Sequence, residues 1–110
     1  MPIKEWEIYW IDLGVPIGHE QGFDRPAIIV RYVNGVCLAI PMTTNTMDLS
    51  RFTFTLAITN TNTTNIGKDG VALTFQIRAI DMQRIRSKIG ELEPHQVAAI
   101  KAQLKDMLLL

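Results

Sequence analysis

Hydrophobic positions along this chain gather in short runs of the kind that form β-strands. Residues 6–13 mix aromatic and β-branched residues with partial alternation, and residues 52–58 alternate cleanly between apolar and polar side chains. Further strands are expected where apolar residues run together between turn-forming residues, at 27–33, 36–40, 70–73 and 76–80.

Turn signals set the limits of two of these strands. Asn34-Gly35, the strongest short-range hairpin signal, separates the runs 27–33 and 36–40. We expect Pro41 to end the second of them. Residues 36–40 are apolar without interruption, which indicates burial on both faces. Cys37 is therefore expected to be a small core residue.

Two polar segments interrupt the pattern. Residues 14–26 contain three glycines and two prolines and predict a long loop. Loops longer than about 12 residues in a compact domain are usually functional or disordered. Residues 59–65 consist only of Thr and Asn, and we expect them to form a mobile loop tip.

One helix is expected, over residues 94–108. Pro94 suits the first helical position, where its missing N–H costs nothing. An apolar stripe then recurs at helical spacing, at Val97, Ile100, Leu104 and Leu108. Five or six short strands with one closing helix predict a mainly β (α+β) fold, either a compact barrel or a strongly bent sheet with the helix packed on it.

Length and charge narrow the functional classes. A chain of 110 residues that is 47% hydrophobic fits a single globular domain over residues 1–110. A formal net charge of zero argues against a binder that relies on charge alone to hold nucleic acid. Arg84, Arg86 and Lys88 nevertheless follow one another with no acid between them. This run is either a solvated face or a contact for phosphate.

Some classes of protein are excluded. With Cys37 as its single cysteine, the chain forms no internal disulfide and no cysteine-based zinc site. The first residues lack the apolar region of a signal peptide, and no apolar run approaches the roughly 18 residues of a membrane span. We therefore expect a cytoplasmic protein without a membrane partner.

Several blocks of residues, taken together, resemble the MazF/PemK/Kid toxins of type II toxin–antitoxin systems. The resemblance covers essentially the whole chain in order, although each block alone is a weak signal. The matching blocks are Glu7–Asp12, Gly18–Gly22, Arg25–Val30, Pro41–Thr44, Asp69–Leu73, Gln76–Arg78, Ile80–Asp81, Arg84 and the helix at 94–108.

The resemblance implies an SH3-like barrel of five to seven short strands with a C-terminal helix, assembled as a homodimer. It implies a metal-independent endoribonuclease without a cofactor, which cleaves single-stranded RNA and is inhibited by a MazE/PemI-like antitoxin. The positions that match catalytic or supporting residues are Arg25, Thr43 and Glu20. RNA contacts are expected from His19, Gln21, Thr44, Gln76, Arg78 and Arg84.

These residue types suit cleavage of RNA by its own ribose 2′-OH. Such an enzyme aligns the hydroxyl with the phosphorus, moves two protons and stabilises an anionic phosphorane. Arg25 offers an always-charged planar fork for phosphate oxygens, and the Thr43 hydroxyl adds a donor. Because an arginine is a poor proton acceptor, Glu20 or His19 is the chemically easier base.

Departures from the family keep other functions open. The position before Gln76 is usually acidic but is Phe75 here, so a decayed toxin that only binds RNA or its antitoxin remains an alternative. The gyrase-poisoning toxins of the CcdB type share the barrel, yet their tryptophan-containing C-terminus is absent from this chain. A generic SH3-like interaction domain would leave residues 18–25 unexplained. Trp6 and Trp10 are candidates for base stacking, and we expect Trp10 to lie in the core.

Overall fold

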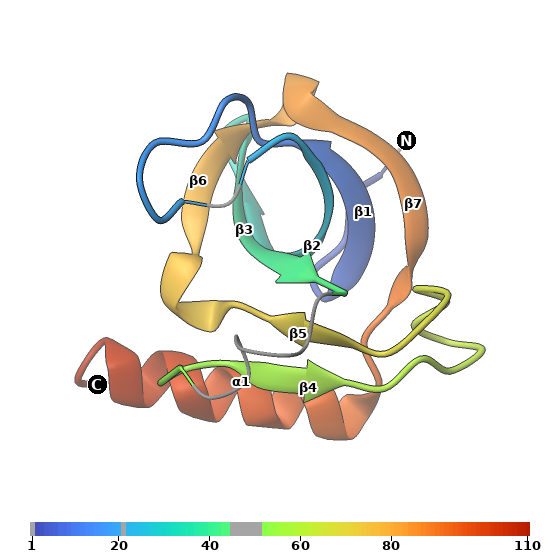
Figure 1. The fold of residues 1–110 in the computed structure, drawn as a ribbon, viewed down its shortest axis with the longest axis vertical. Coiled ribbons are helices and arrows are strands. Elements are labelled where there is room, and N and C mark those ends of the chain that lie inside the picture. The colour runs from blue at the N-terminus through green and yellow to red at the C-terminus, as the bar shows by residue number, and fades with distance from the viewer. Residues whose placement is uncertain (1, 21, 45–51) are drawn as a thin grey trace.

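Seven strands and one C-terminal helix build the fold (Figure 1), in a computed structural model that describes residues 2–20, 22–44 and 52–110. The elements in chain order are β1 (Glu7–Asp12), β2 (Asp24–Val33), β3 (Val36–Thr43), β4 (Leu56–Ile58), β5 (Gly70–Ala72), the short 3₁₀ helix η2 (Thr74–Gln76), β6 (Arg78–Asp81), the 3₁₀ helix η3 (Met82–Arg84), β7 (Ile85–Glu91) and α1 (Pro94–Met107).

The strands form one strongly bent antiparallel sheet. Its order is β4-β5-β3-β2-β1-β7, and β6 pairs with the first half of β3 while β5 pairs with the end of that strand. Figure 1 shows β6, β3, β2, β1 and β7 running round a ring, with α1 across one side of the sheet. Within the described residues β6 and β7 share no ladder, so hydrogen bonds do not close the ring. The predicted mainly β fold with a terminal helix is confirmed.

Apolar side chains are buried on both faces of the central strands. Along β1 to β3, neighbouring residues such as Ile28 and Ile29 enter different clusters, because successive side chains of a strand point to opposite faces. One cluster lies under α1, where Ile100 is fully buried. The other lies within the curve of the ring and contains Cys37, as predicted.

The helix begins and ends close to its predicted limits. Pro94 occupies the first turn, and the side chain of Gln96 reaches back to accept a hydrogen bond from the Glu93 backbone N–H at 2.8 Å. This bond satisfies one of the donors that a helix start leaves without an intrahelical partner. In the described part of the chain, no helix has the length and apolar character needed to cross a membrane.

Two strand limits differ from the prediction, and one strand was not predicted at all. Strand β2 already begins at Asp24, so Arg25 lies in a strand rather than in the preceding loop. Pro41 does not end β3, which continues to Thr43 because the Pro41 carbonyl accepts a hydrogen bond from the Leu73 N–H at 2.9 Å. Strand β7 was not predicted, since it is largely exposed and lacks an apolar alternation.

The predicted strand over residues 52–58 is wrong in its first half. Only Leu56–Ile58 is strand, and residues 52–54 form a bend and turn. Phe54 has a left-handed backbone with φ of 61°, which an extended strand cannot contain. The Thr55 hydroxyl donates to the Phe52 carbonyl at 2.9 Å and closes the turn. Likewise, residues 74–76 form η2, so the last predicted strand begins only at Arg78.

Two further predictions need correction. Trp10 is 44% exposed rather than in the core, because it points away from both apolar clusters. The tract 59–65 is packed rather than a loose tip: Thr64 is fully buried and its hydroxyl donates to the Thr59 carbonyl at 3.0 Å. The Thr63 carbonyl accepts a hydrogen bond from the Glu91 N–H at 3.0 Å.

A buried carboxylate joins the N-terminus to β7. Glu7 is 5% exposed, and its oxygens accept bonds from the Lys4 backbone N–H at 2.6 Å and the Tyr9 hydroxyl at 3.2 Å. Lys88 of β7 forms an ion pair with it at 2.6 Å. Burial raises the pKa of Glu7, but the bonds from Lys88, Lys4 and Tyr9 outweigh burial and hold this pKa below its ordinary value.

We expect Glu7 to add stability that is lost in acid. A lowered folded-state pKa means that the contribution is complete above the ordinary pKa of 4.5 and disappears as the pH falls below it. At pH 7, Glu7→Gln should lower the free energy of unfolding by about 1–3 kcal/mol. Urea denaturation of both proteins between pH 7 and pH 3 should show that the difference in their free energies of unfolding shrinks as the pH falls. The exposed Glu91→Gln is the control, and a difference that is independent of pH would contradict the assignment.

Candidate functional site

A closed loop precedes β2 and carries several of the predicted site residues. Its two ends are held together because the Leu13 N–H donates to the Phe23 carbonyl at 2.9 Å and the Phe23 N–H donates to the Gly14 carbonyl at 2.6 Å. Gly14 has φ of +75°, a conformation that favours glycine. The segment between these ends is thus a compact Ω-like loop with a fixed neck.

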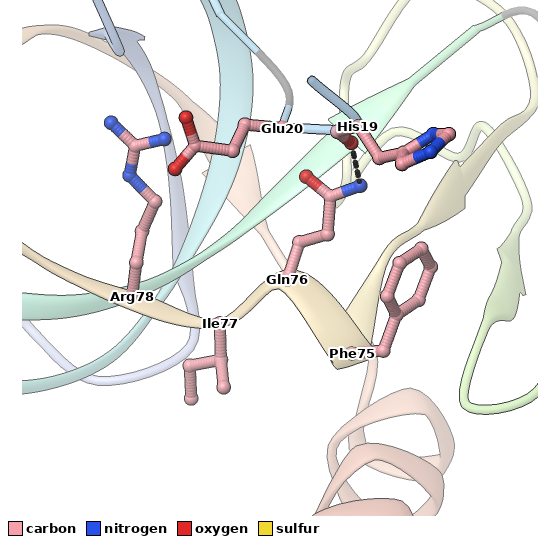
Figure 2. A pocket seen from close by; sticks show the side chains of 6 residues that line it. All are labelled: His19, Glu20, Phe75, Gln76, Ile77 and Arg78. Carbon is pink, nitrogen blue, oxygen red and sulfur yellow. Dashed lines mark hydrogen bonds between the residues drawn. The ribbon is translucent and has the colours of Figure 1, made fainter. Parts of the chain in front are cut away.

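Three predicted site residues, on β2, β6 and η2, hold this loop with side-chain hydrogen bonds. Arg78 of β6 donates through Nη2 to the Leu13 carbonyl at 2.8 Å. Arg25 of β2 donates through Nε to the Gly22 carbonyl at 2.9 Å. Between them, Gln76 of η2 donates through Nε2 to the His19 carbonyl at 2.9 Å (Figure 2). Each bond uses a side-chain donor on a loop carbonyl, so the loop and the strands form one unit.

Arg25 lies near the start of β2 and Thr43 at the end of β3, so both lie at the same end of this antiparallel pair. The β2–β3 ladder itself ends where Ala27 pairs with Pro41. Beyond it, Arg25 pairs with Ile11 of β1 and Thr43 pairs with Val71 of β5. Thr43 is buried at the end of β3, and Arg25 is half-buried. The two positions that the resemblance marks as catalytic therefore lie at the same end of the β2–β3 pair.

An open pocket of about 340 Å³ brings the loop together with η2 and β6. Its lining contains four predicted site residues, His19, Glu20, Gln76 and Arg78, together with Phe75 and Ile77. Figure 2 shows the Glu20 carboxylate turned toward the Arg78 guanidinium at one end and the Phe75 ring rising toward His19 at the other. Glu20 Oε1 also accepts a hydrogen bond from the Ile17 N–H at 3.0 Å, which orients the carboxylate.

The remaining predicted residues, Arg25 and Thr43 among them, are not part of the lining of this pocket. Thr44 is exposed and follows Thr43 directly. Arg84 belongs to η3, and its Nη1 lies 3.4 Å from the position that a Cβ on Gly14 would occupy. Arg84 therefore lies at the neck of the loop rather than in the pocket. Gln21 lies outside the described residues.

The basic run of β7 proves to be partly ion-paired. Lys88 pairs with Glu7, and Arg86 Nη2 lies 3.4 Å from Asp12 Oδ2. Asp12 Oδ1 accepts the Gly14 N–H at 2.9 Å, so this carboxylate also supports the neck of the loop. These ion pairs could not be predicted from the sequence, since β7 itself was not predicted.

Sequence reasoning missed Phe75 as a pocket residue and noted it only as a departure from the resemblance. Its ring lines the pocket because η2 interrupts the strand at this point and turns the side chain outward. The bonds from side chains to loop carbonyls were also missed, since a sequence shows donors but not the carbonyls that they reach.

Comparisons with known proteins identify the family of this chain. The family model of the PemK-like, MazF-like toxins of type II toxin–antitoxin systems matches residues 4–108. Endoribonuclease MazF9 of Mycobacterium tuberculosis is 29% identical over 113 residues, covering 94% of this chain and 93% of that protein.

Solved structures share the fold across nearly the whole chain. MazF of Deinococcus radiodurans has a TM-score of 0.80 and 23% identity, covering 98% of this chain and 97% of the other. A mycobacterial endoribonuclease in complex with its cognate antitoxin has a TM-score of 0.74 and 18% identity, covering 100% and 97%.

The neck of the loop should tolerate no side chain at Gly22. A Cβ there would lie 2.7 Å from the Gly14 carbonyl oxygen and from the Pro16 nitrogen, so the Gly22→Ala chain must open the loop. We expect hydrogen exchange of the Leu13 and Phe23 amides, measured by NMR, to quicken about tenfold or more.

Gly18→Ala is the matched control for this experiment. A Cβ at Gly18 meets nothing within 4 Å, although its φ of +59° makes the substitution conformationally unfavourable. The two amides should therefore keep their protection in Gly18→Ala. Unchanged protection in Gly22→Ala would contradict the packing described at the neck.

Proposed function

Because this chain belongs to the PemK-like, MazF-like toxins of type II toxin–antitoxin systems, we propose that it is an endoribonuclease that cleaves single-stranded mRNA and thereby arrests growth. The observation that supports the proposal is the pocket that gathers His19, Glu20 and Arg78, with Arg25 bound to the same loop through the Gly22 carbonyl. A candidate base and an always-charged donor lining one pocket suit cleavage of RNA by its own 2′-OH.

The proposed reaction uses the nucleophile of the RNA itself. The ribose 2′-oxygen attacks the phosphorus, the bond from phosphorus to the 5′-oxygen breaks, and the products are a 2′,3′-cyclic phosphate and a 5′-OH. A base takes the proton of the 2′-OH, and the leaving 5′-oxygen gains one proton. No metal is required for this balance, since the transition state needs charge stabilisation rather than a new nucleophile.

Residue roles follow from the chemistry of each side chain. We assign Arg25 to charge stabilisation, because its bond to the Gly22 carbonyl uses Nε and a guanidinium has further donors on its two Nη atoms. We assign the Thr43 hydroxyl as a further donor to the phosphorane. Glu20 is the preferred base because it lines the pocket and Ile17 orients it.

We expect cleavage of a long single-stranded RNA in EDTA to give discrete fragments with cyclic-phosphate 3′ ends. Arg25→Ala and Thr43→Ala should each lower the cleavage rate by about 100-fold or more, the usual cost of removing a donor to a developing oxyanion. Arg31→Ala removes an exposed arginine elsewhere on β2 and should cleave like the unmodified protein.

Circular dichroism must show that each of these variants is folded. A folded protein that binds this RNA without cutting it would overturn the nuclease assignment. That result would favour the binding-only alternative, which rests on Phe75 in place of the usual acid before Gln76.

We propose that the protein works as a homodimer in the cytoplasm, where mRNA is translated, and that an antitoxin inhibits it. MazE–MazF complexes are known from Deinococcus radiodurans. An acidic antitoxin segment would be complementary to the arginines around the loop. The face of β2 and β3 that continues beyond the α1 cluster exposes Val33, Val36 and Leu38, and we assign it to the second copy of the chain.

We expect Leu38→Glu to weaken this dimer, because it would bury a charge in an apolar interface. Sedimentation velocity at micromolar concentration should show a dimer for the unmodified protein and a monomer for the variant. Val15→Glu, at an exposed apolar position in the loop, should stay dimeric. A dimeric Leu38→Glu protein would place the interface elsewhere.

A further inference from the structure

Two phenylalanine rings are exposed together beside the pocket. Phe52 is 46% and Phe75 is 38% exposed, and their ring centroids lie 6.1 Å apart at an interplanar angle of 88°. Rings of this size usually contribute buried area to a core, so a solvent-facing pair indicates a surface that meets a partner. An edge-to-face pair covers at most one face of one ring, which leaves aromatic surface open for stacking.

The pocket has an aromatic end and a charged end. Figure 2 shows the Phe75 ring rising toward His19, the Gln76 amide in the middle, and the Arg78 guanidinium beside Glu20 at the far end. Phe75 and Arg78 are three residues apart, so roughly 10 Å of extended chain separates them at most. That reach suits one nucleotide laid along the pocket, with its base at the ring and a phosphate at the guanidinium.

Hydrogen bonds hold the ring pair in place from behind. Gln103 of α1 accepts from the Thr74 hydroxyl at 2.7 Å and donates to the Thr55 carbonyl at 2.6 Å. The Thr55 hydroxyl in turn donates to the Phe52 carbonyl at 2.9 Å. Thr74 is fully buried and adjoins Phe75, so one helix residue fixes the segments that carry both rings.

The backbone adds a direct link between the two segments. The Phe75 N–H donates to the Phe54 carbonyl at 3.1 Å, and Phe54 adopts its left-handed conformation at this contact. A surface that is rigid before binding loses less conformational freedom when it takes a ligand. The pair is thus built as a fixed platform rather than as two loose side chains.

We propose that Phe75, braced by Phe52, is a stacking platform for one unpaired base of the RNA and sets the base preference next to the cut. The proposal rests on the ribonuclease function proposed above. Unpaired bases stack on aromatic rings, and arginine recognises phosphate, which are the two ends that this pocket offers. A purine offers the larger stacking surface and is the base expected on the platform.

The same surface could hold an apolar side chain of a protein partner, but the neighbouring groups favour RNA. A peptide anchor would need an apolar surround, whereas four of the five other lining residues are polar: His19, Glu20, Gln76 and Arg78, with Ile77 the exception. A mostly polar surround that contains a guanidinium fits a nucleotide, whose base is flat and whose backbone is anionic.

The first test measures binding without cleavage. Single-stranded 2′-deoxy oligonucleotides of the cleaved sequence lack the nucleophile, and their dissociation constants can be measured by fluorescence anisotropy. For the unmodified protein, replacing one base at a time by an abasic residue should weaken binding about tenfold at one position. Phe75→Leu keeps an apolar side chain without a ring. This variant should bind the intact oligonucleotide more weakly, to the same extent as the abasic replacement weakens binding to the unmodified protein.

The double substitution identifies the contact. In Phe75→Leu the abasic residue at that position should cost nothing further, because the partner ring is already missing. Phe75→Trp should restore the affinity and the purine preference of cleavage. Gln103→Leu, which leaves both rings but cuts their bonds to α1, should blur that preference in the cleavage pattern while the fragments still end in cyclic phosphate.

Several results would overturn the platform. Equal abasic costs in the unmodified protein and in Phe75→Leu, or affinity unchanged by Phe75→Leu, would contradict it while the ribonuclease assignment stands. Normal cleavage by Phe75→Leu with escape from the antitoxin would assign the ring pair to a protein partner instead. An unmodified protein that neither binds nor cuts RNA would contradict the proposed function itself.

Discussion

Burial of β1, β2 and β3 on both faces is the constraint from which the site follows. Ile28 faces the cluster under α1, while Ile29 faces the cluster inside the ring. With both faces occupied by apolar side chains, the register of these strands cannot slip, because a shift of one residue would exchange the two clusters and move the polar positions inward. The fixed register in turn holds Arg25, near the start of β2, and Thr43, at the end of β3, at the same end of this strand pair.

Arg25 and Arg78 have two roles at this end of the sheet. Arg78 and Arg25 bind the Leu13 and Gly22 carbonyls, at the two ends of the loop, and both are also candidates to bind phosphate. A guanidinium has five donors in a fixed fork, so it can hold a carbonyl with one nitrogen and present others to an anion. A lysine could not do both in a fixed geometry. Substituting either arginine is therefore expected to disturb the loop together with any contact to RNA.

Much of the fold could be predicted from the sequence, and the failures share a physical cause. Patterns of apolar residues found β1, β2, β3 and α1, because burial dominates there. They failed where hydrogen bonds outside the local pattern decide the conformation. The Phe54 carbonyl accepts a bond from the Phe75 N–H, and the buried Thr64 hydroxyl donates to the Thr59 carbonyl. Strand β7 has little apolar content, so no hydrophobic pattern predicted it.

The candidate site residues were named by resemblance rather than by pattern. Arg25 and Thr43 are single polar residues, and their position at the same end of two strands depends on a pairing that no local rule supplies. Phe75 shows a limit of prediction by resemblance. Resemblance marked it as the loss of an acid, since a family pattern describes what a position usually holds and not what a substitute can do. Its exposure, its contact with Phe52 and its support by the Thr74–Gln103 bond are properties of the folded chain, and they turn an apparent defect into a surface with its own chemistry.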